Sequence, residues 1–371
     1  MIFLFFTDEL SEKNGWGRYS LDLVLSLQGL GHQVLVICNH QNNSFPQIKQ
    51  KELLFNPLNY RLNYLLFWLI ALKIYFFTYR SEFTVIHCLV EIYAPIAWFF
   101  SVLKRKPMFV TLHGSFGLKP LFYYWPGKLQ RFIYRNKRTK IVCISNYTKF
   151  RLIKKLGFSP KIQIIPNGVN LSKIGNRQPL LNVRQPITLL GVGALKQRKG
   201  FHLVVEALPK ILGFFPEVRY WIVGNQRDKV YVEKLKERIQ ELGLVDHISF
   251  FENISDEKLN DLYCLASLFV LTPLSNEYNF EGFGLVYLEA NSFGLPVVGM
   301  KDNGGEEAIV HGKTGLLSET GDIDSISESV IKILGDPNIY AMMSANALVW
   351  SQNHNWVAIS KKYLDFYSKN D

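Results

Sequence analysis

Two carboxylates, Glu281 and Glu289, lie eight residues apart in the segment EGFGLVYLEA, whose residue types are well suited to chemistry. Its glycines let the backbone approach a ligand closely, and the apolar residues from Leu285 predict a helix that begins near Gly284. Because a helix N-terminus carries unpaired N–H groups and a positive dipole end, it can bind a phosphate. The pattern therefore predicts a ligand with a phosphate and hydroxyl groups. The structural alternative is a tight turn before a buried helix.

A pair of cations, Arg198 and Lys199, lies between a predicted strand at 187–192 and a predicted helix at 200–212. Cations beside a helix N-terminus are suited to a diphosphate, although a solvated basic loop would have the same composition. Further along, Ser255 is expected to cap the helix 256–266.

The first half of the chain offers a glycine segment and a histidine. Gly15, Trp16 and Gly17 are expected to form a loop between a predicted buried strand at 2–7 and a helix that ends near Leu30, and open α/β sheets bind ligands at such strand ends. No third glycine completes a dinucleotide fingerprint, so a dehydrogenase is disfavoured. His113 follows the predicted strand 108–112, where it is either a site residue or a hydrogen-bonded core histidine.

Strand and helix patterns alternate along both halves, which predicts two α/β domains with parallel sheets. We expect an N-terminal domain at 1–171, a linker at 172–186 and a C-terminal domain at 187–350. Further strands are expected at 33–38, 85–89, 141–145, 162–166, 218–223, 247–251, 268–272 and 296–299. Further helices are expected from 146 to Gly157 and at 230–243, 284–293, 303–310, 324–334 and 355–368.

Composition indicates the compartment. The four cysteines are scattered without metal-ligand spacing, which indicates buried thiols in a reducing environment. The N-terminus is expected to be a strand and not a signal peptide. A cytoplasmic location is therefore expected, and peripheral attachment to the inner face of the cytoplasmic membrane is compatible with it.

Charge is distributed unevenly. Residues 1–173 hold 23 Lys and Arg against 7 Asp and Glu, a balance of +16, while the rest of the chain balances at −5. Aromatic and basic residues alternate in 119–161, which suggests an anionic membrane surface as a partner. The apolar stretch 58–77 is too interrupted to span a bilayer and is expected to be a buried or partly membrane-surface helix.

Taken together, these motifs resemble the retaining glycosyltransferases of family 4. EGFGLVYLEA is similar to the family's E-x7-E signature, ALKQRKG to its basic loop, IIPNGVN to its hinge segment, and NGGEEAIVHGKTG to a further glycine motif. Asn170, Asn303 and Glu306 depart from the family pattern, where aspartate, glycine and proline stand. The matches run in the family's order from about residue 14 to 315.

The resemblance implies the GT-B fold: two Rossmann-like domains that face a central cleft, with the final helix returning to the first domain. It places the nucleotide sugar (UDP-, GDP- or ADP-linked) in the C-terminal domain and the acceptor in the N-terminal one. The acceptor is expected to be a glycan or a lipid-linked molecule, and no nucleic acid is expected.

The resemblance also implies roles for individual residues. Glu281 contacts the hydroxyls of the donor sugar, and Glu289 contacts those of the ribose. His113 lies near the donor sugar, and the departing phosphate helps to deprotonate the acceptor. Catalytic roles fall to Glu281, His113, Arg198 and Lys199. The remaining donor-binding residues are Gly15, Trp16, Gly17, Asn253, Ile254, Phe283, Gly284 and Leu285.

No cofactor or metal is expected beyond the donor itself. Asp322 and Asp324 are similar to a metal-binding DxD motif, but a helix N-cap explains them better. Glu307 is expected to order its loop. Two rival functions stay open at this point: a nucleotide-sugar isomerase on the same fold, and a basic protein that binds nucleic acid.

Overall fold

The computed structural model describes every residue except 13, 56–62, 172–173, 175–177, 179 and 371, and gives the backbone alone for 63–68 and 125. The chain forms two compact units, residues 1–168 with 356–371, and residues 169–355. Part of the predicted linker and the first residues of the apolar stretch 58–77 lie outside the described residues.

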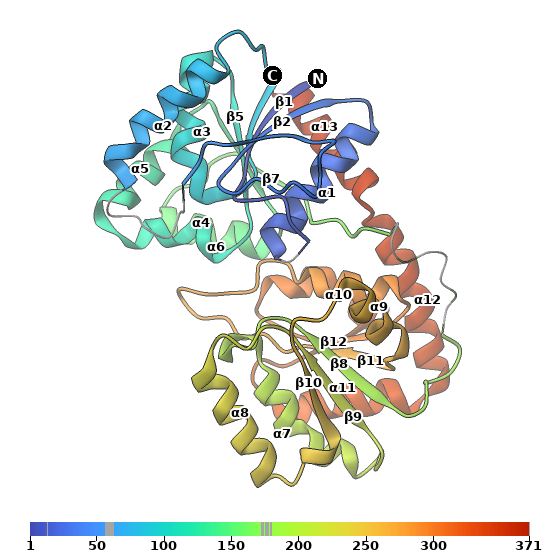
Figure 1. Ribbon diagram of the computed structural model, residues 1–371. Coiled ribbons are helices and arrows are strands. Elements are labelled where there is room, and N and C mark those ends of the chain that lie inside the picture. The colour runs from blue at the N-terminus through green and yellow to red at the C-terminus, as the bar shows by residue number, and fades with distance from the viewer. Residues whose placement is uncertain (13, 56–62, 172–173, 175–177, 179, 371) are drawn as a thin grey trace. The chain divides into compact units, whose positions relative to one another are not determined.

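The first unit is built on a parallel sheet in the order β3-β2-β1-β4-β5-β6-β7 (Figure 1). Its central strands are apolar on both faces because helices cover both, as is typical of parallel sheets. The strands are β1 (Ile2–Phe6), β2 (Gln33–Cys38), β3 (Lys49–Glu52), β4 (Val85–Cys88), β5 (Met108–Leu112), β6 (Thr139–Cys143) and β7 (Ile162–Ile164).

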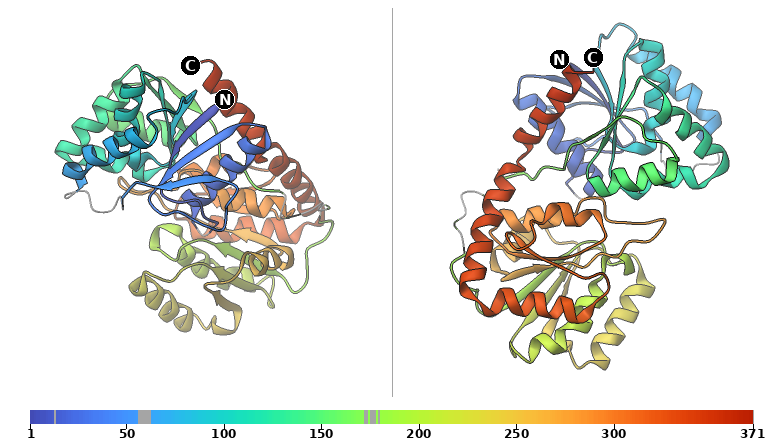
Figure 2. Two further views of the ribbon diagram at one scale, coloured as in Figure 1. Left: turned by 45° about the horizontal axis from the view of Figure 1, so that its top comes forward. Right: turned by 180° about the vertical axis from the view of Figure 1, so that it is seen from behind.

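Helices of the first unit pack in two groups. Helices α1 and α13 lie side by side, while α3 packs against both α2 and α5 (Figures 1 and 2). The helices are α1 (Gly15–Gly29), α2 (Asn63–Phe77), α3 (Ala94–Lys104), α4 (Ser115–Leu118), α5 (Tyr124–Arg135), α6 (Asn146–Leu156) and α13 (Trp356–Ser368).

The second unit has a parallel sheet in the order β10-β9-β8-β11-β12-β13. Helix α7 packs on α11, and α10 packs on α12. The strands are β8 (Thr188–Val192), β9 (Arg219–Val223), β10 (Ile248–Phe251), β11 (Leu268–Val270), β12 (Val297–Met300) and β13 (Gly315–Ser318). The helices are α7 (Phe201–Leu212), α8 (Lys229–Glu241), α9 (Asp256–Leu265), α10 (Leu285–Ser292), α11 (Ile323–Gly335) and α12 (Pro337–Asn353).

Both sheets reverse their strand order once, between β1 and β4 and between β8 and β11. The loops that leave two such strands diverge to opposite faces and open a crevice at the carboxyl ends, where doubly wound sheets bind ligands. In the second unit these loops carry Arg198, Lys199 and Glu281. In the first unit they lead to Gly15 and to Glu91.

A buried polar network fixes α13 to the first sheet. His87 on β4 hydrogen-bonds the Tyr367 hydroxyl at 2.6 Å and the Thr111 hydroxyl at 2.9 Å. Tyr19 of α1 bonds the Tyr363 hydroxyl at 2.7 Å and Thr111 at 3.1 Å. Burial, with a smaller contribution from His113, lowers the pKa of His87 to about 3, so the ring is neutral. Residues from both ends of the chain therefore share one core.

Several local predictions are wrong in detail. Residues 15–17 form the first turn of α1 and not a loop, because Asn14 caps that helix through a bond from the Gly17 N–H at 2.8 Å. The segment predicted as a helix at 303–310 is a short 3₁₀ helix, Gly304–Ala308, since its two glycines disfavour a longer one. Helices α3, α5 and α12 and strands β3 and β13 were not predicted.

Helix α2 was expected to be either buried or partly at a membrane surface, and its described side chains are buried on one side only. From Leu69 onward Ala71 and Ile74 are buried, but Leu69, Leu72 and Phe76 are exposed, and Phe76 keeps 73% of its surface accessible. A helix that is apolar all round can bury only one side against α3. Among the described residues, no helix combines the length and apolar character that a bilayer span requires.

Candidate active site

The loop after β8 is built to present two cations. It forms a 3₁₀ turn, Gln197–Lys199, that ends at Gly200 with φ of 75°. A Cβ on Gly200 would collide with the Thr272 carbonyl oxygen, so only glycine fits this close approach. The Leu274 N–H donates to the Arg198 carbonyl at 2.8 Å and joins this loop to the one that follows β11.

The loop after β11 ends at Gly284, which caps α10 with φ of 75°. Helix α10 begins at Leu285, as the sequence predicted. The Tyr287 ring lies beneath Gly284 and its hydroxyl donates to the Leu271 carbonyl at 2.6 Å. Phe283 is buried beside it. The first turn of α10 is therefore held against the end of β11.

Glu281 lies between the two cations. Lys199 Nζ is 2.6 Å from Glu281 Oε2, and Arg198 Nη1 is 3.3 Å from the same oxygen. Burial raises the pKa of the Glu281 carboxyl, but Lys199 and then Arg198 outweigh it, and the pKa is lowered. The three side chains, here termed the Glu281 cluster, carry one net positive charge. The structure thus brings these three predicted residues together.

The segment after β12 supports the Glu281 loop from behind. The Gly304 N–H donates to the Glu281 carbonyl at 2.9 Å, and a Cβ on Gly304 would collide with the Gly282 carbonyl. Asn303 is buried, donates to the Met300 carbonyl at 2.7 Å and accepts from the Gly305 N–H at 2.8 Å. Its amide therefore orders the turn at the position where the sequence departs from the family's glycine.

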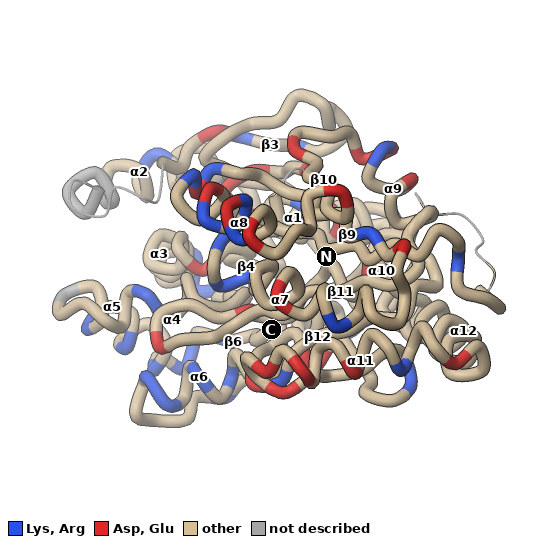
Figure 3. The backbone as a smooth tube through the Cα atoms, turned by 90° about the horizontal axis from the view of Figure 1, so that it is seen from below, with Lys and Arg blue, Asp and Glu red and all other residues tan. Residues whose placement is uncertain are grey.

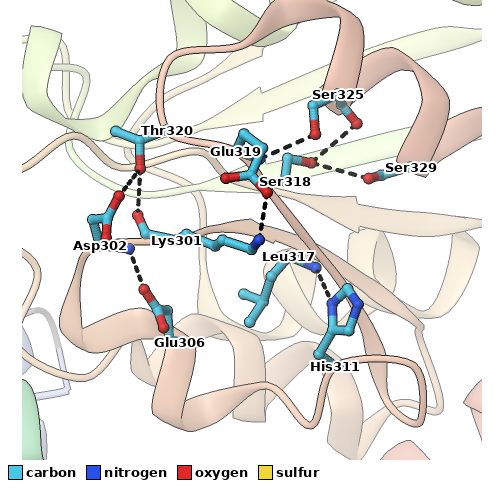
Figure 4. A network of polar contacts seen from close by, with 10 residues as sticks. All are labelled: Lys301, Asp302, Glu306, His311, Leu317, Ser318, Glu319, Thr320, Ser325 and Ser329. Carbon is cyan, nitrogen blue, oxygen red and sulfur yellow. Dashed lines mark hydrogen bonds and ion pairs between the residues drawn. The ribbon is translucent and has the colours of Figure 1, made fainter.

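An outer layer of polar contacts fixes this segment to the loop that follows β13 (Figure 4). The Thr320 hydroxyl donates to the Lys301 carbonyl at 3.0 Å and to Asp302 Oδ2 at 2.7 Å. Lys301 also pairs with Glu319, and Glu306 accepts from the Asp302 N–H. Glu306 thus orders a turn in the place of the family's proline, and Glu307 lies on the same 3₁₀ helix.

Glu289 lies one turn inside α10 and apart from the contacts of the Glu281 cluster. It is half-buried, and its Oε2 accepts a hydrogen bond from the Tyr263 hydroxyl of α9 at 3.2 Å. Helix α9 begins at the predicted base-binding loop. There Asn253 has φ of 56°, Ile254 follows, and Ser255 caps the helix by accepting from the Lys258 N–H at 3.1 Å. The predicted N-cap is confirmed.

In the first unit, His113 is held in one tautomer. Its Nε2 donates to the Leu89 carbonyl at 2.8 Å, and its ring forms a T-shaped contact with the Tyr19 ring, with centroids 4.3 Å apart. Burial lowers its pKa to about 4, so the imidazole is neutral. The indole of Trp16 meets the Phe116 ring at 4.7 Å.

Glu91 lies directly behind His113. One of its oxygens accepts from the His113 backbone N–H at 3.2 Å. The other, Oε2, is buried without a partner among the described residues. Burial raises the pKa of Glu91 to about 8, so the carboxyl is neutral at pH 7.

Comparison with protein families covers nearly the whole chain. A model described as glycosyl transferases group 1 matches residues 173–350, and one described as glycosyltransferase family 4 matches residues 13–173. The chain belongs to the family 4, group 1 glycosyltransferases.

Two relatives of this family 4 chain have names that refer to phosphatidylinositol. A GDP-mannose-dependent alpha-(1-6)-phosphatidylinositol monomannoside mannosyltransferase of Mycolicibacterium smegmatis is 28% identical over 60% of this chain and 59% of its own length. The phosphatidylinositol N-acetylglucosaminyltransferase GPI3 subunit of Saccharomyces cerevisiae is 24% identical over 70% of this chain and 56% of its own. The chain thus spans under three fifths of the length of these relatives.

Solved structures confirm the GT-B fold of this family 4 chain. Anabaena Alr3699/HepE, solved in complex with UDP and glucose, superposes with a TM-score of 0.80 at 20% identity and full coverage of both chains. At that identity the likeness concerns the fold alone.

Asp322 and Asp324 have structural partners in this family 4 chain. Asp322 caps α11 by accepting from the Ser325 N–H at 3.0 Å, and Asp324 pairs with Lys210 at 2.8 Å. The predicted N-cap is confirmed. Within the described ranges, no three His, Cys, Asp or Glu side chains gather as a metal site would require.

Two polar residues near the predicted sites were missed. Glu91 had a signal in the sequence, because it is an acidic residue just past the carboxyl end of an apolar strand. Tyr263 had none, since a tyrosine on an amphipathic helix is ordinarily a core residue. Its link to Glu289 depends on how α9 and α10 pack.

Proposed function

We propose that this chain is a retaining glycosyltransferase that moves a hexose-type sugar from a nucleotide sugar to an acceptor hydroxyl. The observation that carries the proposal is the Glu281 cluster at the switch point of the second sheet, beside the N-terminus of α10. Its net positive charge and the nearby helix N–H groups suit a diphosphate. The second unit would hold the donor and the first unit the acceptor.

The residues of the Glu281 cluster and His113 have different roles in the proposed transfer. Arg198 and Lys199 stabilise the negative charge that develops on the departing diphosphate, a role that needs no metal ion. Glu281 binds hydroxyls of the donor sugar, and its lowered pKa keeps it an acceptor of hydrogen bonds. The departing phosphate oxygen takes the proton of the attacking hydroxyl. Neutral His113 offers its Nδ1 as an acceptor near the sugar, because Nε2 is occupied.

The first test separates binding from transfer. UDP, GDP and ADP are screened by calorimetry, and each nucleotide sugar is assayed with and without candidate acceptors. Glu281→Gln is expected to remove most transfer while nucleotide affinity changes by no more than a few fold, because the lost contacts are to the sugar. Glu289→Ala is expected to weaken nucleotide binding in ground and transition states alike.

The reverse pattern would show that these two roles are exchanged or wrong. Turnover of the donor with no acceptor present would instead indicate an isomerase. Failure of all three nucleotides to bind would overturn the proposal.

We further propose a lipid-linked or polysaccharide acceptor at the cytoplasmic membrane face, with the first unit resting on anionic lipid. The relatives named above act on phosphatidylinositol derivatives. No Asp or Glu occurs between Glu91 and Glu206. In Figure 3, Lys and Arg positions gather around α6.

Exposed aromatics accompany this charge. Tyr123, Tyr124, Phe132 and Phe150 are exposed, as are Leu69, Leu72 and Phe76 of α2. Tyr134, in the same basic and aromatic stretch, is buried in the core. Lys155 Nζ lies 3.4 Å from the centroid of the Phe122 ring. Basic residues with exposed aromatic and apolar neighbours suit the headgroup region of an anionic leaflet.

A further inference from the structure

The hydroxyl of Tyr263 occupies a position fixed by packing. Tyr263 is 2% exposed. Its ring stacks on Phe293 with centroids 5.1 Å apart and planes at 11°, and on Phe269 at 6.2 Å and 26°. Because both stacking contacts hold the ring, the Tyr263 hydroxyl is a rigid donor, and it lies 3.2 Å from Glu289 Oε2.

A half-buried glutamate has three side-chain torsions and needs a restraint to keep one orientation. The bond from Tyr263 fixes one carboxylate oxygen and so sets the direction of the other, Oε1. Ordering a glutamate side chain costs conformational entropy, and a carboxylate ordered before binding does not incur that cost when a ligand arrives.

We propose that Tyr263 is a positioning residue for nucleotide binding, which orients Glu289 toward the two ribose hydroxyls. This inference rests on the proposed role of Glu289 as the ribose contact. Tyr263 itself touches no ligand in this scheme and acts through the carboxylate.

Helix α9 gives this arrangement a second consequence. The same helix is capped by Ser255, directly after Asn253 and Ile254 of the predicted base-binding loop, and ends at Leu265 beyond Tyr263. A base that seats against that loop and a ribose that meets Glu289 are therefore registered to one rigid element. The spacing of base and ribose is set by α9.

The experiment compares a nucleotide with its 2′,3′-dideoxy counterpart. The diphosphate that binds most tightly among UDP, GDP and ADP is titrated calorimetrically into wild type, Tyr263→Phe and Glu289→Gln, followed by its dideoxy form. Wild type is expected to prefer the ribonucleotide by roughly tenfold or more, as two hydrogen bonds to a charged group would give. Tyr263→Phe is expected to lose most of that preference while its affinity for the dideoxy form stays within about twofold.

A matched control is Tyr340→Phe. Tyr340 is also buried in the second unit, and its hydroxyl donates to the Ser267 carbonyl at 2.8 Å. That variant loses a buried tyrosine hydroxyl without touching Glu289, so its ribose preference should equal that of wild type.

The outcomes distinguish the inference from the function on which it rests. A full ribose preference in Tyr263→Phe, or an equal loss of affinity for both nucleotide forms, overturns the positioning role. A wild type that binds nucleotide without ribose preference overturns the role of Glu289, and the positioning role with it. A wild type that binds none of the three nucleotides overturns the proposed function.

Discussion

Lys199 and Arg198 differ in how closely they are held to Glu281. The lysine lies nearer, at 2.6 Å against 3.3 Å, and its side chain is 12% exposed against 35% for the arginine. Water screens a buried charge less, so the lysine should act more strongly on charge that develops near the carboxylate. The two cations are therefore not equivalent partners for a diphosphate.

We expect Lys199→Ala to lower kcat by on the order of 10²-fold or more, and Arg198→Ala by a smaller factor, as for removal of one preorganised stabilising donor. Steady-state rates with the preferred nucleotide sugar measure both. Lys196→Ala is the control, because Lys196 is an exposed cation on the same loop. A control variant as slow as Lys199→Ala would argue against a specific role for the cluster.

Glu91 should make the stability of the first unit depend on pH. Its pKa is about 8 in the folded chain, against an ordinary value of 4.5, because burial disfavours the carboxylate. Between these values the unfolded chain releases a proton that the folded chain keeps. The stabilisation is therefore complete below pH 4.5 and is lost as pH rises toward 8.

We expect the unfolding free energy of wild type, measured by calorimetry, to fall relative to that of Glu91→Gln between pH 5 and pH 8. The difference should then level off, after a total change of a few kcal/mol. The glutamine variant has a neutral side chain of similar shape throughout. Shared titrating groups cancel in the difference between the two proteins. A difference that does not vary over this pH range would mean that Glu91 is ionised in the folded state.

At the scale of elements, the start of α10 depends on one glycine. Gly284 has φ of 75°, and a Cβ there would meet both the Tyr287 ring and Gly305. Gly321 has the same φ of 75° with nothing within 4 Å of its missing Cβ. The two positions therefore separate backbone strain from a steric collision.

Gly321→Ala is expected to cost about 1–2 kcal/mol of unfolding free energy, from the left-handed backbone alone. Gly284→Ala should lower the unfolding free energy by clearly more, because the Tyr287 ring must move away from the new Cβ. Urea unfolding followed by circular dichroism measures both. Equal losses would show that the ring yields without cost.

The sequence predicted elements where one local signal dominated. Strand β5 has its predicted bounds because an apolar run defines it. Helix α6 was predicted to stop at Gly157 and ends one residue earlier, since that glycine is its C-cap. Helix α12 was missed because its apolar residues are spread around it without a clear face. The bond between Tyr263 and Glu289 joins two helices, and no local pattern encodes that contact.

At the scale of the whole molecule, the charge asymmetry should direct the chain to anionic lipid. We expect it to float with anionic liposomes at low salt, less so near 0.5 M salt, where the Debye length is roughly 4–5 Å, and poorly with neutral liposomes. Absence of flotation with anionic liposomes at low salt would favour an acceptor that is free in solution.

The structure shows which cations can be reversed safely. Arg131 donates to the Lys155 carbonyl at 3.3 Å and Arg135 lies 4.4 Å over Phe158, so their replacement would disturb packing. Lys137, Arg138 and Lys154 are exposed, and their joint change to Glu is expected to abolish flotation while nucleotide binding persists. The control changes the same number of exposed lysines in the second unit, namely Lys229, Lys234 and Lys332.

The packing of α13 into the first core has a consequence for synthesis. Trp356, Ile359 and Tyr363 belong to the same core as β1 and α1, although hundreds of residues separate them. The second unit ends at Asn355, directly before α13. As the ribosome releases the chain, the second unit can therefore fold first. The core of the first unit stays partly exposed until α13 has been synthesised. Until α13 is made, chaperones would bind the exposed core of the first unit, most of which is synthesised well before that helix.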